Sequence, residues 1–150
     1  MLDVFRTLNI SASGLTAQRA RLDVIASNIA NAETTRSDEG GPYRRKAVIF
    51  REVFEEAVGE AHYRDNRLQT DSMQGVEIAA IEADKRPFRL VYDPSHPDAN
   101  DEGYVQMPNV NVLREMVDLI NAQRSYEANV TAMNATKSFV NAALQIGKGG

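Results

Sequence analysis

The side chains best suited to chemistry in this sequence lie close together, around two prolines. They are Asp93, His96, Asp98 and Asp101. Carboxylates and an imidazole at such spacing can bind a cation weakly or exchange protons with a substrate. Prolines and aspartates also build turns, in which a carboxylate accepts hydrogen bonds from nearby backbone N–H groups. We therefore interpret these residues as turn caps, and we expect no metal and no cofactor.

Other catalytic patterns are missing from the sequence. Ser95, His96 and Asp98 lie too close together for a hydrolase triad, which is assembled from distant segments. His62, the other histidine, has no partner at metal-ligand spacing, and Gly40-Gly41 lacks the pattern of a phosphate-binding loop. The absence of cysteine excludes thiolate nucleophiles, disulfides and cysteine zinc sites. We expect no enzymatic activity, and an acid–base enzyme built on the aspartates is the weakest alternative.

The composition narrows the possible partners. A chain of 150 residues with 43% hydrophobic and 25% charged residues fits one modest folded domain. Its net charge of −4 argues against a nucleic-acid binder, and the absence of tryptophan argues against a stacking platform for bases or sugars. We expect no nucleic-acid partner and no small-molecule substrate. The sequence contains no run of about 18 apolar residues, so we expect no segment that spans a bilayer. The start of the sequence lacks the basic and apolar regions of a cleaved signal, so we expect none.

The elements that must position these residues begin with an N-terminal helix. Apolar residues recur at steps of three and four, which predicts a helix over residues 3–31 whose seam packs lengthwise against another helix. Ile25 widens this stripe, and Gly14 marks the close approach of a neighbour. The predicted seam consists of Phe5, Leu8, Ala12, Leu15, Arg19, Leu22, Ala26 and Ile29.

The C-terminal part of the chain repeats this pattern. Asn111 is placed to cap the helix, and Glu115 lies where the helix dipole favours a carboxylate. Leu113, Ile120 and Phe139 form a second apolar flank, so this helix can contact more than one partner. Its predicted seam consists of Val112, Met116, Leu119, Gln123, Tyr126, Val130, Met133, Lys137, Val140 and Leu144.

A small β-rich insert separates the two predicted helices. Alternating or β-branched apolar residues predict short strands at residues 47–50, 76–80, 88–92 and 104–107. Residues 54–58 continue as strand or as one helical turn, and the polar residues 59–74 predict a long loop. The predicted fold class is α+β, with long terminal helices in segments 1–35 and 109–150 packing as a coiled-coil-like pair around the insert at 36–108.

Periodicity alone does not determine which surface covers the apolar stripe of each helix. The helices can pack on each other as a hairpin, on copies of the chain, or on other proteins. Arg19, Gln123 and Lys137 would sit poorly in one dry two-helix interface, which favours additional partners. The competing interpretation is a cytoplasmic helical-hairpin adaptor or an export chaperone.

Two charged loops of opposite sign complete the candidate sites. We expect both to be exposed and to make lateral contacts, either with each other across subunits or with neighbouring proteins. Solvated turns and a solvated strand end are the alternative. The basic loop contains Arg44, Arg45 and Lys46, and the acidic loop contains Asp93, Asp98 and Asp101.

Several motifs carry a family resemblance. Ala26-Ser-Asn-Ile-Ala-Asn31, preceded by Ile10-Ser-Ala-Ser-Gly-Leu15, resembles the N-terminal signature of flagellar rod and hook axial proteins. The continuation Ala32-Glu-Thr-Thr-Arg36, together with Val91-Tyr-Asp-Pro-Ser-His-Pro-Asp-Ala-Asn100 and Tyr126-Glu-Ala-Asn-Val130, is similar to the proximal-rod members of that family. The resemblance spans nearly the whole chain except residues 51–90.

The resemblance implies a structural subunit of the flagellar drive shaft, which crosses the periplasm as part of the basal body. It implies export through the flagellar type III apparatus without a cleaved signal, and assembly with copies of itself, with proximal and distal rod proteins and with the protein joining the rod to the MS ring. The terminal helices would form a tubular inner layer around the export channel. The expected assembly interface comprises Phe5, Leu8, Leu15, Leu22, Ile25, Asn28, Ile29, Asn31, Met116, Leu119, Tyr126, Val130, Met133, Val140 and Leu144.

Overall fold

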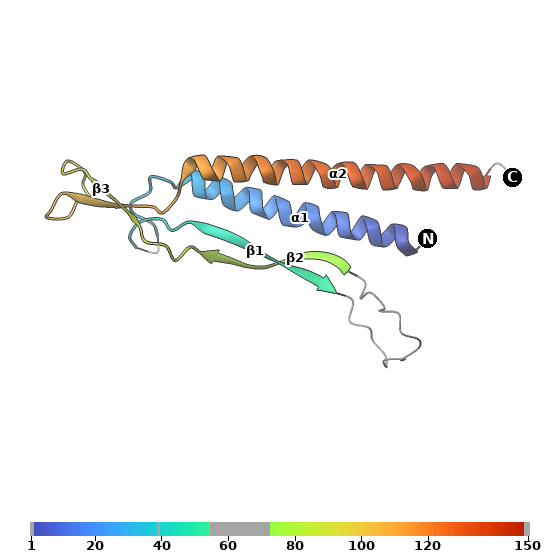
Figure 1. Ribbon diagram of the computed structural model, residues 1–150, viewed down its shortest axis with the longest axis horizontal. Coiled ribbons are helices and arrows are strands. Elements are labelled where there is room, and N and C mark those ends of the chain that lie inside the picture. The colour runs from blue at the N-terminus through green and yellow to red at the C-terminus, as the bar shows by residue number, and fades with distance from the viewer. Residues whose placement is uncertain (1, 39, 55–72, 149–150) are drawn as a thin grey trace, which may run out of the picture.

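The computed structural model describes residues 2–38, 40–54 and 73–148, and it has an elongated shape (Figure 1). Helix α1 (Leu2–Ala30) and helix α2 (Val112–Lys148) run side by side, with both termini at one end of the molecule. The strands between them are β1 (Lys46–Phe54), β2 (Met73–Ala83), β3 (Arg89–Tyr92) and β4 (Tyr104–Met107). The predicted α+β class, with two long terminal helices and a small β insert, is confirmed.

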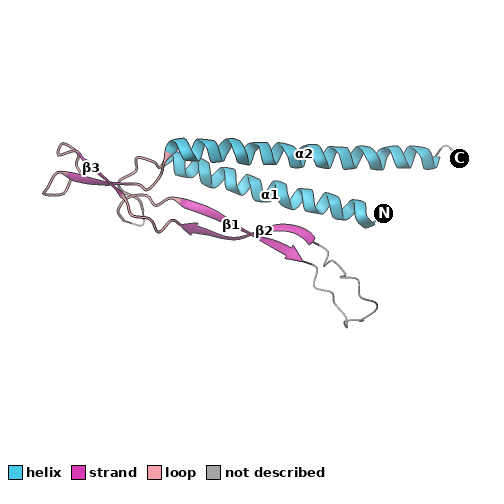
Figure 2. Cartoon of the chain, viewed as in Figure 1, coloured by secondary structure: helices cyan, strands magenta, loops and turns pink. Residues whose placement is uncertain are grey.

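The four strands form two separate antiparallel hairpins (Figure 2). β1 pairs with β2 and lies along α1, whereas β3 pairs with β4 beyond the other end of the helices. β2 begins at Met73, so the predicted loop over 59–74 is wrong for its last two residues, because they extend the ladder with β1. The rest of that loop and residues 55–58 lie outside the described residues.

A glycine lets the β1–β2 hairpin approach α1. Gly75 has φ +133, and a Cβ on it would lie 2.2 Å from Ser13 Oγ. The same hydroxyl accepts a hydrogen bond from the backbone N–H of Val76 at 3.1 Å. A larger residue at position 75 would therefore separate the sheet from the helix.

The two helices pack antiparallel in one register. Asn28 of α1 meets Glu115 of α2, and 14 residues along each helix Gly14 meets Asn129. A Cβ on Gly14 would lie 3.0 Å from Asn129 Nδ2, which confirms that this glycine marks a close approach. The register places the first residue of α1 opposite residue 141, so the last two turns of α2 project beyond its partner. Residues 141–147 are all exposed.

Apart from Ile25, small and polar residues occupy the buried side of α1, in place of the predicted apolar stripe. Ser11, Ala17, Ile25 and Asn28 are buried there. The bulkier residues Leu8, Leu15, Leu22 and Ile29 of the predicted seam are only half-buried. Close helix packing at Gly14 leaves room for small side chains at the centre of the contact, so the leucines lie on its flank. The predicted α1 seam is therefore wrong as the centre of the contact within this chain.

Local hydrogen bonds define the helix ends nearest the insert. Asn111 Oδ1 accepts a hydrogen bond from the backbone N–H of Arg114 at 3.1 Å, which confirms the predicted N-cap of α2. At the end of α1, Asn31 Nδ2 donates to the Ser27 carbonyl at 2.9 Å, and its Oδ1 accepts from the Thr34 hydroxyl at 3.2 Å.

Neither helix, over its described residues, has a stretch apolar and long enough for a membrane span.

Candidate assembly interface

One buried amide connects both helices to the β insert. Asn28 is fully buried, and its Nδ2 donates to the Lys46 carbonyl at 2.8 Å and to Glu115 Oε2 at 2.9 Å. Its Oδ1 accepts from the Tyr43 hydroxyl at 2.9 Å and from the Lys46 N–H at 2.9 Å. An asparagine amide has two donor hydrogens and two acceptor lone pairs, so the side chain is fully satisfied. We call this meeting point of α1, α2 and the start of β1 the junction.

A buried ion pair lies beside that amide. Glu115 is 1% exposed, and its Oε1 accepts a hydrogen bond from Arg45 Nε at 2.6 Å. The Arg45 guanidinium also lies 3.8 Å from Asp84 and 3.9 Å from Asp118. Its side chain is only 18% exposed, so the expected exposure of Arg45 is wrong. The charge of Arg45 is therefore used within the chain.

The other members of the basic loop are also engaged within the chain. Arg44 Nη1 donates to the carbonyls of Asp84 and Arg86 at 2.9 and 3.1 Å, and its guanidinium lies 4.2 Å above the Phe88 ring. The Lys46 amine lies 5.9 Å from the centre of the Tyr43 ring. Arg44 and Lys46 therefore contact other parts of the insert, whereas Arg45 connects the insert to α2.

Asn109 and Asp84 complete the junction from the side of the second hairpin. Asn109 Nδ2 donates to the Asp84 and Arg86 carbonyls at 3.2 and 3.0 Å, and its Oδ1 accepts from the Arg45 N–H at 2.9 Å. Hydrogen bonds from Arg86, with smaller contributions from the charges of Arg86 and Arg45, lower the pKa of Asp84 to about 2. Asp84 is therefore ionised across the physiological range.

Turn capping accounts for the residues that first suggested chemistry. Asp93 Oδ1 accepts from the N–H and the hydroxyl of Ser95 at 3.0 and 2.6 Å, and these hydrogen bonds lower the pKa of Asp93. His96 Nδ1 accepts from the Asp98 N–H at 3.1 Å. The interpretation of Asp93 and His96 as turn caps is confirmed. His62 lies outside the described residues.

Asp98 ties this acidic loop to the segment after α1. Its Oδ2 accepts a hydrogen bond from the Thr35 hydroxyl at 2.7 Å, and its other oxygen pairs with Arg36. The Thr35 hydrogen bond is the main cause that lowers the pKa of Asp98. The side chain is 18% exposed, so the expected exposure of Asp98 is wrong, whereas Asp101 is exposed. Within the described part of the chain, no three metal-ligating side chains cluster.

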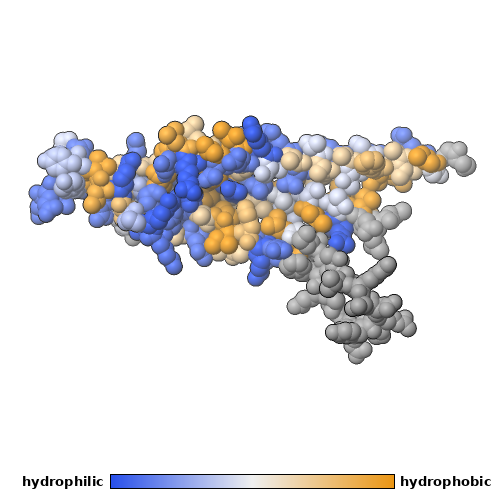
Figure 3. All heavy atoms as spheres, viewed as in Figure 1, coloured by the Kyte–Doolittle hydropathy of each residue, from blue (hydrophilic) through white to orange (hydrophobic). Residues whose placement is uncertain are grey.

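Large apolar side chains remain uncovered along α2. Figure 3 shows hydrophobic residues at the surface along the helix pair, mixed with hydrophilic ones. Leu113, Phe139 and Ile146 are 76%, 76% and 81% exposed. Val117 and Ile120 add to this face at 58% and 50%. Leu113, Val117 and Ile120 follow steps of four and three and so share one helix face, and an exposed apolar face is typical of a protein-binding surface.

The residues expected in the assembly interface fall into three burial classes. Ile25 and Asn28 are buried and therefore satisfied within the chain. Phe5, Met116 and Leu144 are 62%, 50% and 55% exposed. The half-buried members are Leu8, Leu15, Leu22, Ile29, Asn31, Leu119, Tyr126, Val130, Met133 and Val140.

The sequence interpretation missed Tyr43, Asp84, Asn109 and the partners of Glu115. Glu115 did carry a signal, because it lies in the first turn of α2. The helix dipole accounts for that position equally well, so nothing in the sequence indicated that Arg45 and Asn28, expected at contacts between subunits, are partners of Glu115.

Two family models match the segments that contain the helices. The model described as "Flagella basal body rod protein" matches residues 8–36, most of α1 and the segment after it. The model described as "Flagellar basal body rod FlgEFG protein C-terminal" matches residues 101–146, which contain β4 and most of α2. The paired terminal helices and both matches define the class of flagellar basal-body rod proteins.

Relatives covering nearly the whole chain identify the family within that class. The chain is 50% identical over 155 aligned positions to the flagellar basal-body rod protein FlgC of Bacillus subtilis, covering 98% of this chain and 100% of the relative. It is 45% identical over 152 positions to the FlgC of Borreliella burgdorferi, covering 99% and 100%. It is 40% identical to the FlgC of Escherichia coli O157:H7, covering 99% and 98%. The chain belongs to the FlgC family of flagellar basal-body rod proteins.

Proposed function

We propose that this chain is a structural subunit of the proximal rod of the bacterial flagellar basal body. The observation that carries the proposal is its identity of 40–50% to rod proteins along nearly the full chain. In this role it assembles into a tube around the export channel and transmits torque for motility. It needs no catalysis, since an assembled shaft works through its contacts.

The exposed apolar faces support assembly with neighbours. Burying a leucine or phenylalanine side chain contributes about 1.5–3 kcal/mol, and α2 leaves several of them in water. The surfaces on α1 and α2 differ from each other, so contacts between copies pair unlike patches. Contacts of that kind generate open helical assemblies instead of closed dimers.

The helices and the insert have separate roles in this proposal. Segments 1–35 and 109–150 form the inner layer, and segment 36–108 forms an outer layer that meets neighbours. Within the inner layer, the exposed Phe5, Met116 and Leu144 and the half-buried leucines beside the α1–α2 contact bind adjacent subunits. The junction keeps insert and helices in one orientation, since its buried polar groups are satisfied only in that arrangement.

The partners follow from the position in the rod. They are copies of this chain, other proximal and distal rod proteins, the protein that joins the rod to the MS ring, and the type III export apparatus. Export takes place without a cleaved signal, and the assembled subunit lies in the part of the rod that crosses the periplasm. The alternative, a cytoplasmic helical-hairpin adaptor or export chaperone, explains neither the full-length identity to rod proteins nor the exposed faces of α2.

Labelling the chain in cells tests this function. A tagged copy should replace the native gene, and basal bodies should be purified and imaged with a probe for the tag. We expect the label on the rod near the inner membrane, and loss of swimming when the gene is deleted. A tagged chain that supports swimming but is absent from purified basal bodies and bound to other flagellar proteins in the cytoplasm would favour the adaptor instead.

A further inference from the structure

The second hairpin carries opposite charges at its two ends. Residues 85–89, which lead into β3, contain three cationic side chains and no carboxylate. Residues 93–102, between β3 and β4, contain four carboxylates and no lysine or arginine. We call the first segment the basic rim and the second the acidic tip. Such a division produces attraction between the tip of one molecule and the rim of another.

Only part of this charge is neutralised within the chain. Asp98 pairs with Arg36, and Arg86 pairs with Asp84. Asp101 and Glu102 at the tip have no ion-pair partner among the described residues, and the same holds for Lys85 and Arg89 at the rim. All four of these side chains are exposed. The uncompensated charges are therefore those best placed to meet another molecule.

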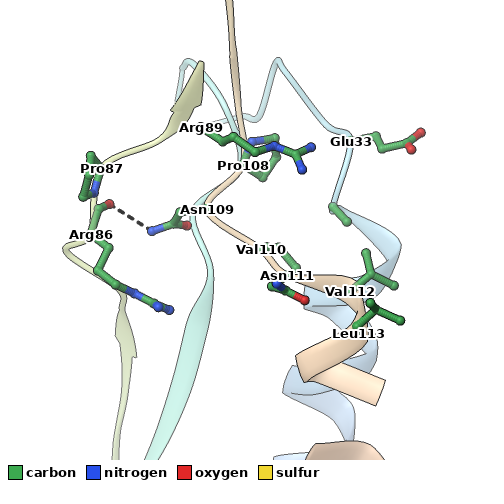
Figure 4. Close-up of a pocket in the computed structure, with 11 residues that line it drawn as sticks. Glu33, Arg86, Pro87, Arg89, Pro108, Asn109, Val110, Asn111, Val112 and Leu113 are labelled. Carbon is green, nitrogen blue, oxygen red and sulfur yellow. Dashed lines mark hydrogen bonds between the residues drawn. The ribbon is translucent and has the colours of Figure 1, made fainter. Parts of the chain in front are cut away.

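An apolar groove lies directly beside the basic rim. Figure 4 shows it between the segment after α1, the residues before β3 and the start of α2. Its volume is about 660 Å³, which is ample for aromatic side chains. Its charged lining residues are Arg86, Arg89 and Glu33, so cations outnumber carboxylates there. The apolar part of its lining consists of Ala32, Pro87, Pro108, Val110, Val112 and Leu113.

An exposed pair of aromatic rings flanks the acidic tip, at the end of β3 and the start of β4. Tyr92 and Tyr104 are 64% and 41% exposed, and their rings meet edge to face with centroids 5.2 Å apart. Gly103, with φ +82, allows this packing, because a Cβ there would lie 2.9 Å from the Tyr92 ring. A rigid aromatic group loses little conformational entropy on binding and is a common anchor of interfaces.

The tip and the groove of one chain cannot reach each other. Tyr92 pairs with Tyr104 at the tip end of the hairpin, and Arg89 pairs with Met107 at its base. Three residues of extended strand separate these positions, which is about 10 Å. The complementary surface must therefore come from another molecule.

We propose that the acidic tip of one copy docks into the apolar groove of the next, with Tyr92 and Tyr104 against its apolar lining and Asp101 and Glu102 beside Lys85 and Arg89. The contact pairs unlike surfaces of identical chains, so it repeats from subunit to subunit. This inference rests on the proposed function, since it places copies of the chain next to each other in the rod. The sequence analysis expected Arg44 and Arg45 to contact the acidic loop, but both are engaged within the chain. In this proposal the exposed Lys85 and Arg89 take that role.

Disulfide cross-linking in assembled basal bodies tests this contact, because the chain has no cysteine of its own. An Arg89→Cys, Glu102→Cys variant should be purified within basal bodies, mildly oxidised and run on a non-reducing gel. The two positions are too far apart for a disulfide within one chain. We expect bands at multiples of the 16.6 kDa chain. The matched control combines Arg89→Cys with Glu52→Cys, an exposed residue of the other hairpin, and should give no such bands.

Charge reversal provides a second measurement that does not depend on oxidation. Lys85→Glu with Arg89→Glu, and separately Asp101→Lys with Glu102→Lys, should each cause loss of swimming, and combining all four should restore it in part. Rods that contain the cysteine variant but give no multiples, or a cross-link to a protein of another size, would overturn docking between copies. Full swimming of both charge-reversed variants would also overturn it. Absence of the unmodified chain from purified basal bodies would instead refute the proposed function.

Discussion

The junction and the free end of the helix pair, where α2 projects beyond α1, differ in whether their side chains have partners within the chain. At the junction, Asn28 and Glu115 are buried, and each side-chain oxygen or nitrogen has a partner within the chain. At the free end, Phe139 and Ile146 are 76% and 81% exposed, and residues 141–147 project beyond α1. One region is complete within a single chain, and the other is not.

This difference indicates how one sequence can define a subunit and still polymerise. A polar network that is fully satisfied in one arrangement favours that arrangement over others. Exposed apolar helix faces define little within the monomer, because a long helix gains most of its stability from tertiary packing. The junction therefore fixes the shape of the subunit, and the free helix faces supply surface for neighbours.

Of the variants considered, removal of the buried Glu115 carboxylate at the junction should have the largest effect on stability. Glu115→Ala removes the acceptor of Arg45 Nε and of one Asn28 N–H, and it leaves the guanidinium only the more distant carboxylates of Asp84 and Asp118. We expect a loss of about 3–5 kcal/mol in the free energy of unfolding, because one partner of a buried ion pair is removed. Urea unfolding followed by circular dichroism measures it. Glu127→Ala, on an exposed position of the same helix, should change stability by less than about 0.5 kcal/mol. Equal losses in the two variants would contradict the role of the junction.

A charge on the half-buried flank of the helices should act on assembly. Leu22→Asp or Val130→Asp places a carboxylate where the assembled tube is proposed to bury a side chain, at a cost of several kcal/mol if the charge is unpaired. We expect both variants to be synthesised and both to stop swimming. His96→Ala should be nearly neutral by comparison, since it removes one hydrogen bond in a half-buried turn. Normal swimming of both aspartate variants together with a non-motile His96→Ala would reverse this assignment.

A charge on the exposed face of α2 should distinguish an effect on assembly from an effect on folding more clearly than the half-buried positions do. Met116 is 50% exposed in the monomer and lies one residue from the buried Glu115. Met116→Asp should leave the free energy of unfolding within about 0.5 kcal/mol and still stop swimming. Asn121→Asp, also exposed on α2, is the control and should affect neither. A swimming Met116→Asp strain would remove this face from the proposed interface.

The smallest expected effect concerns acid stability of the junction. The pKa of Asp84 lies at about 2 in the folded chain against an ordinary value of 3.8, because Arg86 donates hydrogen bonds to the carboxylate. Its ionised form therefore contributes stability above about pH 4, and this contribution is lost as the pH falls towards 2. Asp84→Asn should flatten the pH dependence of the urea midpoint in this window, leaving the part due to Asp93 and Asp98. An unchanged slope would show that the Arg86 contact does not persist in solution.

The sequence predicted the elements well because their signals are local. Steps of three and four marked both helices, and Asn111 marked the start of α2 through a contact only three residues away. The strand at residues 104–107 was predicted with its observed bounds. Each of these features depends on side-chain period or on a nearby backbone group, which a single sequence displays directly.

The junction was not predicted because its contacts join distant residues. Asn28 and Glu115 are 87 positions apart, and Arg45 and Glu115 are 70 apart. A basic triplet looks the same whether its guanidinium meets water or a buried carboxylate. The centre of the helix contact on α1 was also misplaced, because Gly14 and Ser11 permit a closer approach than the leucines of the predicted stripe.

Hydrogen exchange of the purified, dilute chain tests the contrast between the two regions most directly. We predict that the amide of Lys46 and those of the helical turns around Asn28 and Glu115 exchange only on global unfolding. Amides of residues 141–147, and of the α1 turns nearest its first residue, should exchange with little protection, because neighbouring subunits are missing. Uniform protection along both helices would contradict the account, since it would show a helical hairpin that is complete without any neighbour.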